Sequence, residues 1–130
     1  MSNIIRVSEL SPNSEWLVMS NQGTDCFLEL LLTAADDLEI TEHQKELISF
    51  LDDQRSVNNV SPGTVGFDIV DMPWDEKCLI EDIEFLNQVV EVAQTEAAIT
   101  RLPYEINNEI VLPWLEQFGS MVEQMKQGRD

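Results

Sequence analysis

A net charge of −18 at pH 7, from 25 acidic and 7 basic side chains in 130 residues, sets the electrostatics of this chain. A field of that sign repels nucleic-acid phosphates and anionic membrane surfaces, and it attracts basic proteins and cations. With 43% hydrophobic and 25% charged residues, the composition is that of a globular and not a disordered chain, and the length fits a single domain over residues 1–130.

The stretch from 25 to 38 is apolar around most of a helical circumference. Apart from Asp37, its polar residues are spaced 4, 4 and 3 apart and fall in one narrow line: Asp25, Glu29, Thr33 and Asp36. A helix that is apolar nearly all round must be enclosed by other elements, and this one is too short to span a bilayer. We therefore predict that residues 25–38 form the central helix of a small bundle, with Thr24 as its cap.

Two short elements are expected before the central helix. The β-branched residues at 3–7 predict a strand. Ser11 and Pro12 are typical of a helix start, with Ser at the cap and Pro in the first turn. A short helix over residues 12–20 is therefore predicted, and Asn21-Gln22-Gly23 is expected to end it.

A capping-box spacing marks the next helix. Thr41 and Gln44 stand three residues apart, which predicts a helix over 42–54. Its apolar residues form one thin stripe, so it is expected to pack on one side only: Leu47, Ile48, Phe50 and Leu51. His43, the single histidine of the chain, is then expected to be solvated in the first turn.

The following segment changes character. Residues 55–66 are rich in Ser, Asn, Gly and Pro, which predicts a loop. Residues 65–72 partly alternate between apolar and polar side chains and could form a strand. The sequence therefore allows a minor two-stranded β element that pairs residues 3–7 with 66–70.

The clearest helical periodicity lies in residues 75–97, with Asp75 as the expected N-cap. Apolar residues recur at spacings of 4 and 3: Leu79, Ile83, Leu86, Val90, Ala93 and Ala97. Lys77, Glu81, Glu84, Gln88, Glu91 and Thr95 occupy the opposite side with the same spacing. One face is thus expected to pack and the other to be wet and acidic.

A last helix is predicted over residues 104–126. Pro113 lies inside it, and because Pro removes a helical hydrogen bond, a kink or a restart is expected there. The fold prediction is a mostly α single-domain bundle of four or five helices, with a possible minor two-stranded β element.

Catalytic and metal-binding motifs are nearly absent from the sequence. Cys26 and Cys78 lack metal-site or redox spacing, and His43 has no nucleophile near it in sequence. Four acids cluster before and at the 75–97 helix, but they do not follow a calcium-loop pattern: Asp68, Asp71, Asp75 and Glu76. We expect no enzyme activity and no cofactor, and divalent-metal binding by this acidic cluster stays an open alternative.

A combination of acidic and aromatic residues is the best candidate for a partner surface. It comprises Phe67, Asp68, Asp71, Trp74, Asp75, Glu76, Glu81 and Glu84. Interfaces use aromatic anchors with complementary charge around them. The alternative is that Phe67 and Trp74 are core residues that fix the long segment between the 42–54 and 75–97 helices against the bundle.

The functional hypothesis is a small acidic protein-binding domain, of the immunity or inhibitor type, that masks a basic partner. The alternative is a structural or self-associating accessory domain without catalytic activity. No nucleic acid or membrane is expected as a partner. A cytoplasmic location is expected, because the first ten residues lack the apolar run of a signal peptide and no 18-residue apolar stretch is present.

Overall fold

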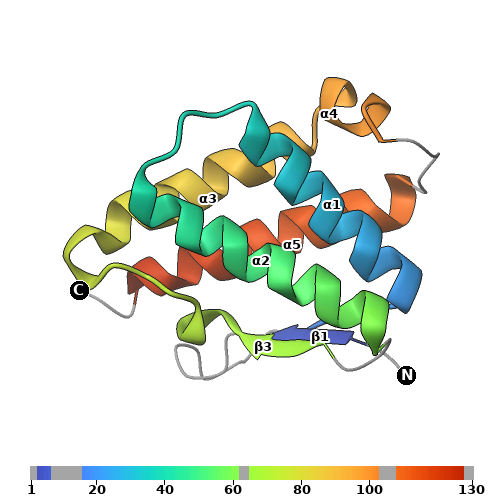
Figure 1. Cartoon of the computed structure of the whole chain (residues 1–130), viewed down its shortest axis with the longest axis horizontal. Coiled ribbons are helices and arrows are strands. Elements are labelled where there is room, and N and C mark those ends of the chain that lie inside the picture. Colours follow the sequence, from blue (N-terminus) through green and yellow to red (C-terminus); the bar gives the residue numbers. More distant parts are fainter. Residues whose placement is uncertain (1–2, 7–15, 62–64, 103–107, 128–130) are drawn as a thin grey trace.

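The computed structural model describes residues 3–6, 16–61, 65–102 and 108–127, and these form a mostly α fold (Figure 1). The helices are α1 Asn21–Asp36, α2 Glu42–Val60, α3 Leu79–Ala93, α4 Glu96–Thr100 and α5 Asn108–Gln127. The strands are β1 Asn3–Arg6, β2 Trp16–Met19 and β3 Gly66–Asp68, and two 3-10 turns are η1 Ile69–Asp71 and η2 Glu76–Cys78. The prediction of a helical bundle is confirmed.

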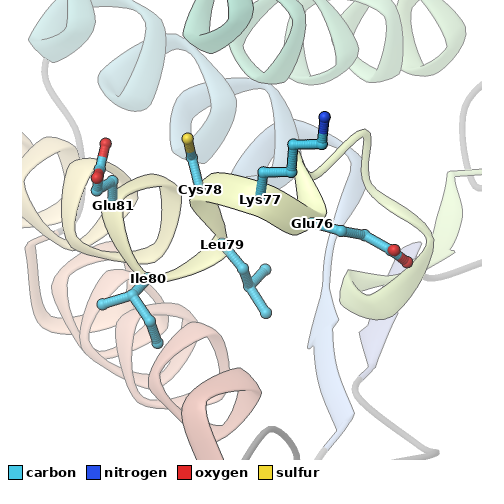
Figure 2. Close-up of a pocket in the computed structure, with 6 residues that line it drawn as sticks. All are labelled: Glu76, Lys77, Cys78, Leu79, Ile80 and Glu81. Atoms are coloured by element: carbon cyan, nitrogen blue, oxygen red, sulfur yellow. The ribbon is translucent and has the colours of Figure 1, made fainter.

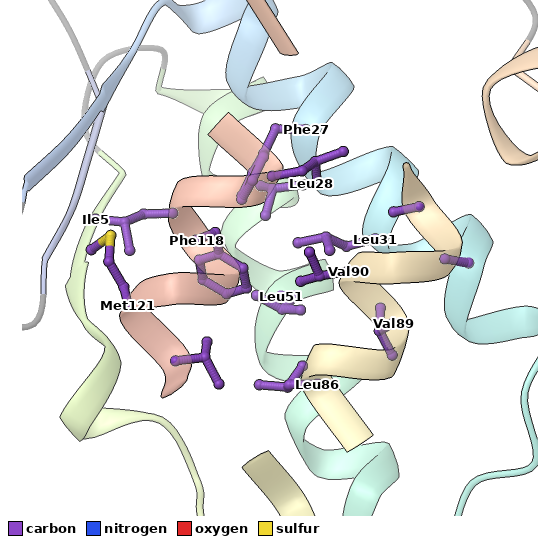
Figure 3. Packing of buried hydrophobic residues seen from close by; sticks show 14 of the residues in the cluster. Ile5, Phe27, Leu28, Leu31, Leu51, Leu86, Val89, Val90, Phe118 and Met121 are labelled. Atoms are coloured by element: carbon purple, nitrogen blue, oxygen red, sulfur yellow. The ribbon is translucent and has the colours of Figure 1, made fainter. Parts of the chain in front are cut away.

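Helix α1 lies at the centre of the bundle and contacts α2, α3, α4 and α5. Its inward side chains are completely buried: Phe27, Leu28, Leu30, Leu31 and Ala34. The ring of Phe27 meets the edge of Phe118 from α5, with 5.4 Å between ring centroids (Figure 3). The predicted central helix is thus confirmed, and its packing joins the other helices into one core.

The start of α1 differs from the prediction. Ser20 is the N-cap, and its side chain accepts a hydrogen bond from the Gly23 N–H. Thr24 is therefore inside the helix, where its hydroxyl is buried and donates to the Ser20 carbonyl oxygen at 2.7 Å. Residues 21–23 belong to the first turn of α1 and do not end a preceding helix, because the chain turns directly from β2 into α1 at Ser20.

A three-stranded sheet with the order β2-β1-β3 covers one side of the bundle. Strand β1 pairs in parallel with β3, which confirms the expected contact between residues 3–7 and 66–70. The predicted helix over 12–20 is wrong at residues 16–19, which form β2 antiparallel to β1. Leu17 and Met19 are buried whereas Val18 is 50% exposed, an alternation typical of a strand. Residues 12–15 lie outside the described part of the chain.

Helix α2 has the predicted start but a later end. The capping box is present, with both the Thr41 and the Gln44 side chains bonded to backbone N–H groups. The helix continues to Val60, so the predicted end at 54 and the predicted loop from 55 are wrong. Polar contacts to other elements explain the extension. Arg55 bonds Asp25 of α1 at 3.0 Å, and Asn58, 4% exposed, bonds Asn3 of β1 at 3.0 Å.

The predicted helix over 75–97 is divided into η2, α3 and α4. Asp75 caps η2, where its carboxylate accepts from the Lys77 N–H, and α3 begins at Leu79. Helix α3 ends at Ala93, and Thr95 then caps α4 by accepting from the Ala98 N–H. This second cap starts a new helix direction, so Ala98 is buried in place of Ala97, which is exposed.

Helix α5 runs through Pro113 without a restart, and Pro113 itself is exposed. The apolar face of α5 is buried: Val111, Leu115, Phe118, Met121, Val122 and Met125. The predicted start at residue 104 lies outside the described residues. Helix α5 packs antiparallel to α3, since Asn87 bonds Glu123 whereas Gly119 lies against Val90. Among the described helices, none combines the length and apolar composition needed to cross a membrane.

Candidate interaction surface

The two aromatic residues of the predicted surface are partly buried and pack against the core. The Phe67 ring stands edge-on to Phe50 of α2, with 5.0 Å between centroids. The indole N–H of Trp74 donates to the Ile69 carbonyl oxygen at 2.7 Å. Both side chains therefore hold the connection between α2 and α3 against the bundle, and only their remaining exposed edges can meet a partner.

The four acids near these aromatics divide into two groups. Asp68 is 6% exposed, and its Oδ1 accepts from the Val70 N–H at 3.0 Å, so it caps η1. Asp75 caps η2 in the same way through the Lys77 N–H at 3.0 Å. Asp71 and Glu76 are exposed. The first pair thus has a structural role, and the second pair presents charge to solvent.

The turn that leads into α3 carries a surface pocket of about 310 Å³ (Figure 2). Its lining is one run of consecutive residues: Glu76, Lys77, Cys78, Leu79, Ile80 and Glu81. In Figure 2, Leu79 and Ile80 point to one side of this turn, whereas Lys77 and Cys78 point to the other. The lining thus comes from η2 and from the first three residues of α3.

Cys78 has an environment that disfavours its thiolate. Partial burial raises the pKa of the Cys78 thiol, and the carboxylates of Glu81, Asp75 and Asp82 raise it further. The thiol is therefore protonated at neutral pH and is a poor nucleophile, because thiol chemistry depends on the thiolate. Cys26 and Cys78 are both free thiols.

His43 is not the solvated side chain that the sequence predicted. Its side chain is 30% exposed, and Nε2 lies 2.9 Å from Oδ2 of Asp82, which is 2% exposed. The same Oδ2 atom accepts the backbone N–H of Asp75 at 3.0 Å. Nδ1 of the ring lies 3.4 Å from Oε2 of Glu46. The pair of His43 and Asp82 thus joins the first turn of α2 to the first turn of α3.

Sequence reasoning missed this pair, although one signal was present. Asp82 stands three residues after Leu79 and four before Leu86, so it occupies a position on the apolar stripe of α3. A carboxylate on a buried face requires a partner, because burying an unpaired charge is costly. The position of Asp82 therefore indicated a buried contact, but the sequence did not identify the partner, His43, which lies 39 residues away.

The outer face of α3 matches the prediction of a wet acidic surface. Glu81, Glu84, Gln88 and Glu91 are all exposed. Next to Glu81, Ile80 is an exposed large apolar side chain, with 46% of its surface accessible. We call Glu76, Ile80, Glu81 and Glu84 the acidic turn. Its three acids belong to the predicted surface, in which Asp71 is exposed as well, whereas Ile80 was not part of that prediction.

Among the described residues, no group of three or more His, Cys, Asp or Glu side chains is arranged to hold a metal ion. Comparisons with protein-family models, with curated proteins and with solved structures find no match to this chain.

Proposed function

We propose that this chain is a small cytoplasmic binding domain whose acidic surface masks a basic protein partner, as an immunity protein or an inhibitor does for a toxin or nuclease. The net charge of −18 supports it, because complementary charge steers a basic partner to the surface and speeds association. The acidic turn is the proposed contact region.

The observation that carries the proposal is the exposure of Ile80 beside carboxylates. Ile80 is 46% exposed, and Glu76, Glu81 and Glu84 lie within four residues of it in sequence. Specific interfaces combine a desolvated apolar anchor at the centre with a polar rim. In this proposal Ile80 enters a pocket of the partner, and the acids contact Lys or Arg around that pocket.

The test is affinity capture of the proteins of the source cells at low salt. We expect a basic protein to be retained by the wild-type chain and released at about 1 M salt, where screening acts over about 3 Å. The double variant Glu76→Lys/Glu81→Lys should lose this protein.

A matched control makes the same change of charge elsewhere. Asp52 and Asp53 are exposed on α2, so Asp52→Lys/Asp53→Lys should retain the partner if the acidic turn is the contact region. Equal loss in both double variants would show that net charge alone attracts the protein. Capture of salt-insensitive proteins only, or of none, would remove the proposal.

A second candidate function is a self-associating accessory domain. Val57 and Val60 are 41% and 83% exposed, and they stand three residues apart on the same side of the last turns of α2. Two apolar side chains in that position could pair with a second copy. Sedimentation over a range of concentrations tests this function, since a strict monomer at high concentration contradicts it.

A further inference from the structure

Strand β2 is an edge of the sheet, because the order of the described strands is β2-β1-β3. The direction of its peptide groups follows from β1. The Ile4 N–H donates to the Val65 carbonyl oxygen at 3.1 Å, so the peptide groups of Ile4 face β3. Successive residues of a strand face opposite sides, so those of Ile5 face its partner Leu17 in β2. Val18, the residue after Leu17, therefore turns its N–H and C=O away from β1.

This outer edge of β2 lacks the features that usually prevent further strand pairing. Natural edge strands carry charged side chains, prolines or bulges. No charged residue and no proline occurs from Trp16 to Thr24, and the four residues of β2 pair one by one with β1, without a bulge. The Val18 side chain is 50% exposed. The edge thus presents backbone donors and acceptors together with an apolar side chain.

Charge limits what can pair with this edge. Two copies of a chain with a net charge of −18 repel each other, which favours contact where neither copy presents acids. One residue in four of the chain is charged, yet residues 16–24 are free of charge. A basic partner is attracted to carboxylates and gains nothing electrostatically at this edge. The uncharged edge therefore suits a second copy of the chain better than a basic protein.

The strand is also complementary to itself. In an antiparallel pair with a two-fold axis at Val18, the two Val18 residues exchange both of their N–H···O=C bonds. Leu17 of each copy then lies opposite Met19 of the other. All three central cross-strand pairs are apolar, and the exposed Val18 side chains cover each other. Such pairs contribute to the stability of a sheet.

We propose that β2 pairs with β2 of a second copy, antiparallel and centred on Val18, and so joins the two three-stranded sheets of a homodimer into one. This inference rests on the self-association given above as the second candidate function, but it places the contact at the sheet edge and not at Val57 and Val60. The acidic turn belongs to η2 and α3, so it is not part of this edge. Salt should strengthen the dimer by screening, whereas it weakens the binding of a basic partner.

The first test is sedimentation equilibrium over a range of protein concentrations at about 0.15 M and about 1 M salt, where screening acts over about 8 Å and about 3 Å. We expect the average mass to rise towards twice that of the chain, and at lower protein concentration in the higher salt. Val18→Lys should remain a monomer, because two lysines would meet at the axis. Val60→Lys is the matched control: it makes the same change of charge at a side chain that is 83% exposed, and it should dimerise as the wild type does.

The outcomes separate this edge from self-association in general. A wild-type chain that stays a monomer removes both. A dimer that persists in Val18→Lys and is lost in Val60→Lys keeps self-association and overturns the edge. Loss of the dimer in both variants would contradict a contact centred on Val18.

Amide hydrogen exchange of the wild type covers the case in which Val18→Lys does not fold. The Val18 N–H faces the edge, whereas the Leu17 N–H faces β1 within the sheet. We expect exchange at Val18 to slow severalfold as protein concentration rises, with exchange at Leu17 unchanged. A Val18 rate that does not depend on concentration would overturn the homodimer. Protection of Val18 only by an added partner protein would assign the edge to a strand of that partner, and it would overturn the homodimer as well.

Discussion

At the scale of single residues, Gly23 fixes how closely α1 approaches α5. A Cβ atom at this position would lie 2.3 Å from Cζ3 and 2.4 Å from Cη2 of Trp114. Such distances are far inside van der Waals contact, so the ring occupies the space that a side chain would need. The first turn of α1 can therefore lie beneath the indole only because residue 23 has no side chain.

Replacement of Gly23 by Ala should destabilise the fold. Overpacking of this kind costs about 1–3 kcal/mol. The higher helix propensity of Ala stabilises the helix by at most about 1 kcal/mol, so the free energy of unfolding should still fall. Urea unfolding followed by tryptophan fluorescence measures it. Gly66→Ala is the control, because a Cβ there meets its nearest atom, the Ile4 carbonyl oxygen, at 3.7 Å. A Gly23→Ala variant as stable as the wild type would contradict this account.

At the scale of elements, local sequence signals were sufficient to predict where α2 begins and which face of α3 is buried. The capping box of Thr41 and Gln44 lies within four residues, and the structure contains it as predicted. The 3.6-residue periodicity likewise identified the buried face of α3, because a long pattern averages out single exceptions.

Other elements depend on contacts that a local pattern does not contain. Trp16–Met19 is too short for its periodicity to separate helix from strand, and pairing with β1 decides its form. Residues 55–60 have the composition of a loop but are helical. Arg55 and Asn58 each bond to a distant element, Arg55 to Asp25 and Asn58 to Asn3. Tertiary contacts here override local propensity.

The same reasoning applies to the candidate surface. The exposed acids of α3 were predictable because they follow a helical period. The buried roles of Asp68 and Asp82 were not predictable, since each depends on how the chain folds back around it. Phe67 and Trp74 had two possible roles, and their contacts with Phe50 and Ile69 give them the packing role.

The cap of α2 yields a prediction at this scale. In Thr41→Ala the Gln44 N–H loses its acceptor, which costs about 0.5–2 kcal/mol. The loss should appear in urea unfolding. Ser49→Ala on the same helix is the control, because Ser49 is exposed in the helix interior, where Ala is tolerated or favourable. Equal stability of the two variants would show that the cap contributes nothing measurable.

At the scale of the whole molecule, acidic side chains far outnumber the basic side chains that could neutralise them. Three described cations already contact carboxylates: Lys45 with Glu42, Arg55 with Asp25 and Glu29, and Arg101 with Asp37. Exposed acids nevertheless extend over α2 and α3, for example Asp52, Asp53, Glu81 and Glu91. A compact state with a net charge of −18 repels itself more than the expanded unfolded chain does.

Added salt should therefore stabilise the fold. Screening reduces the repulsion between exposed acids, and at about 0.15 M salt it acts over about 8 Å, which is the scale of their separation along a helix face. Salt also weakens the few ion pairs, but the excess of 25 acids over 7 bases makes repulsion the larger effect. We expect the thermal midpoint to rise from low salt to about 0.15 M sodium chloride. Potassium chloride should give the same rise if screening and not a specific cation is responsible, and a midpoint that falls steadily with either salt would contradict the argument.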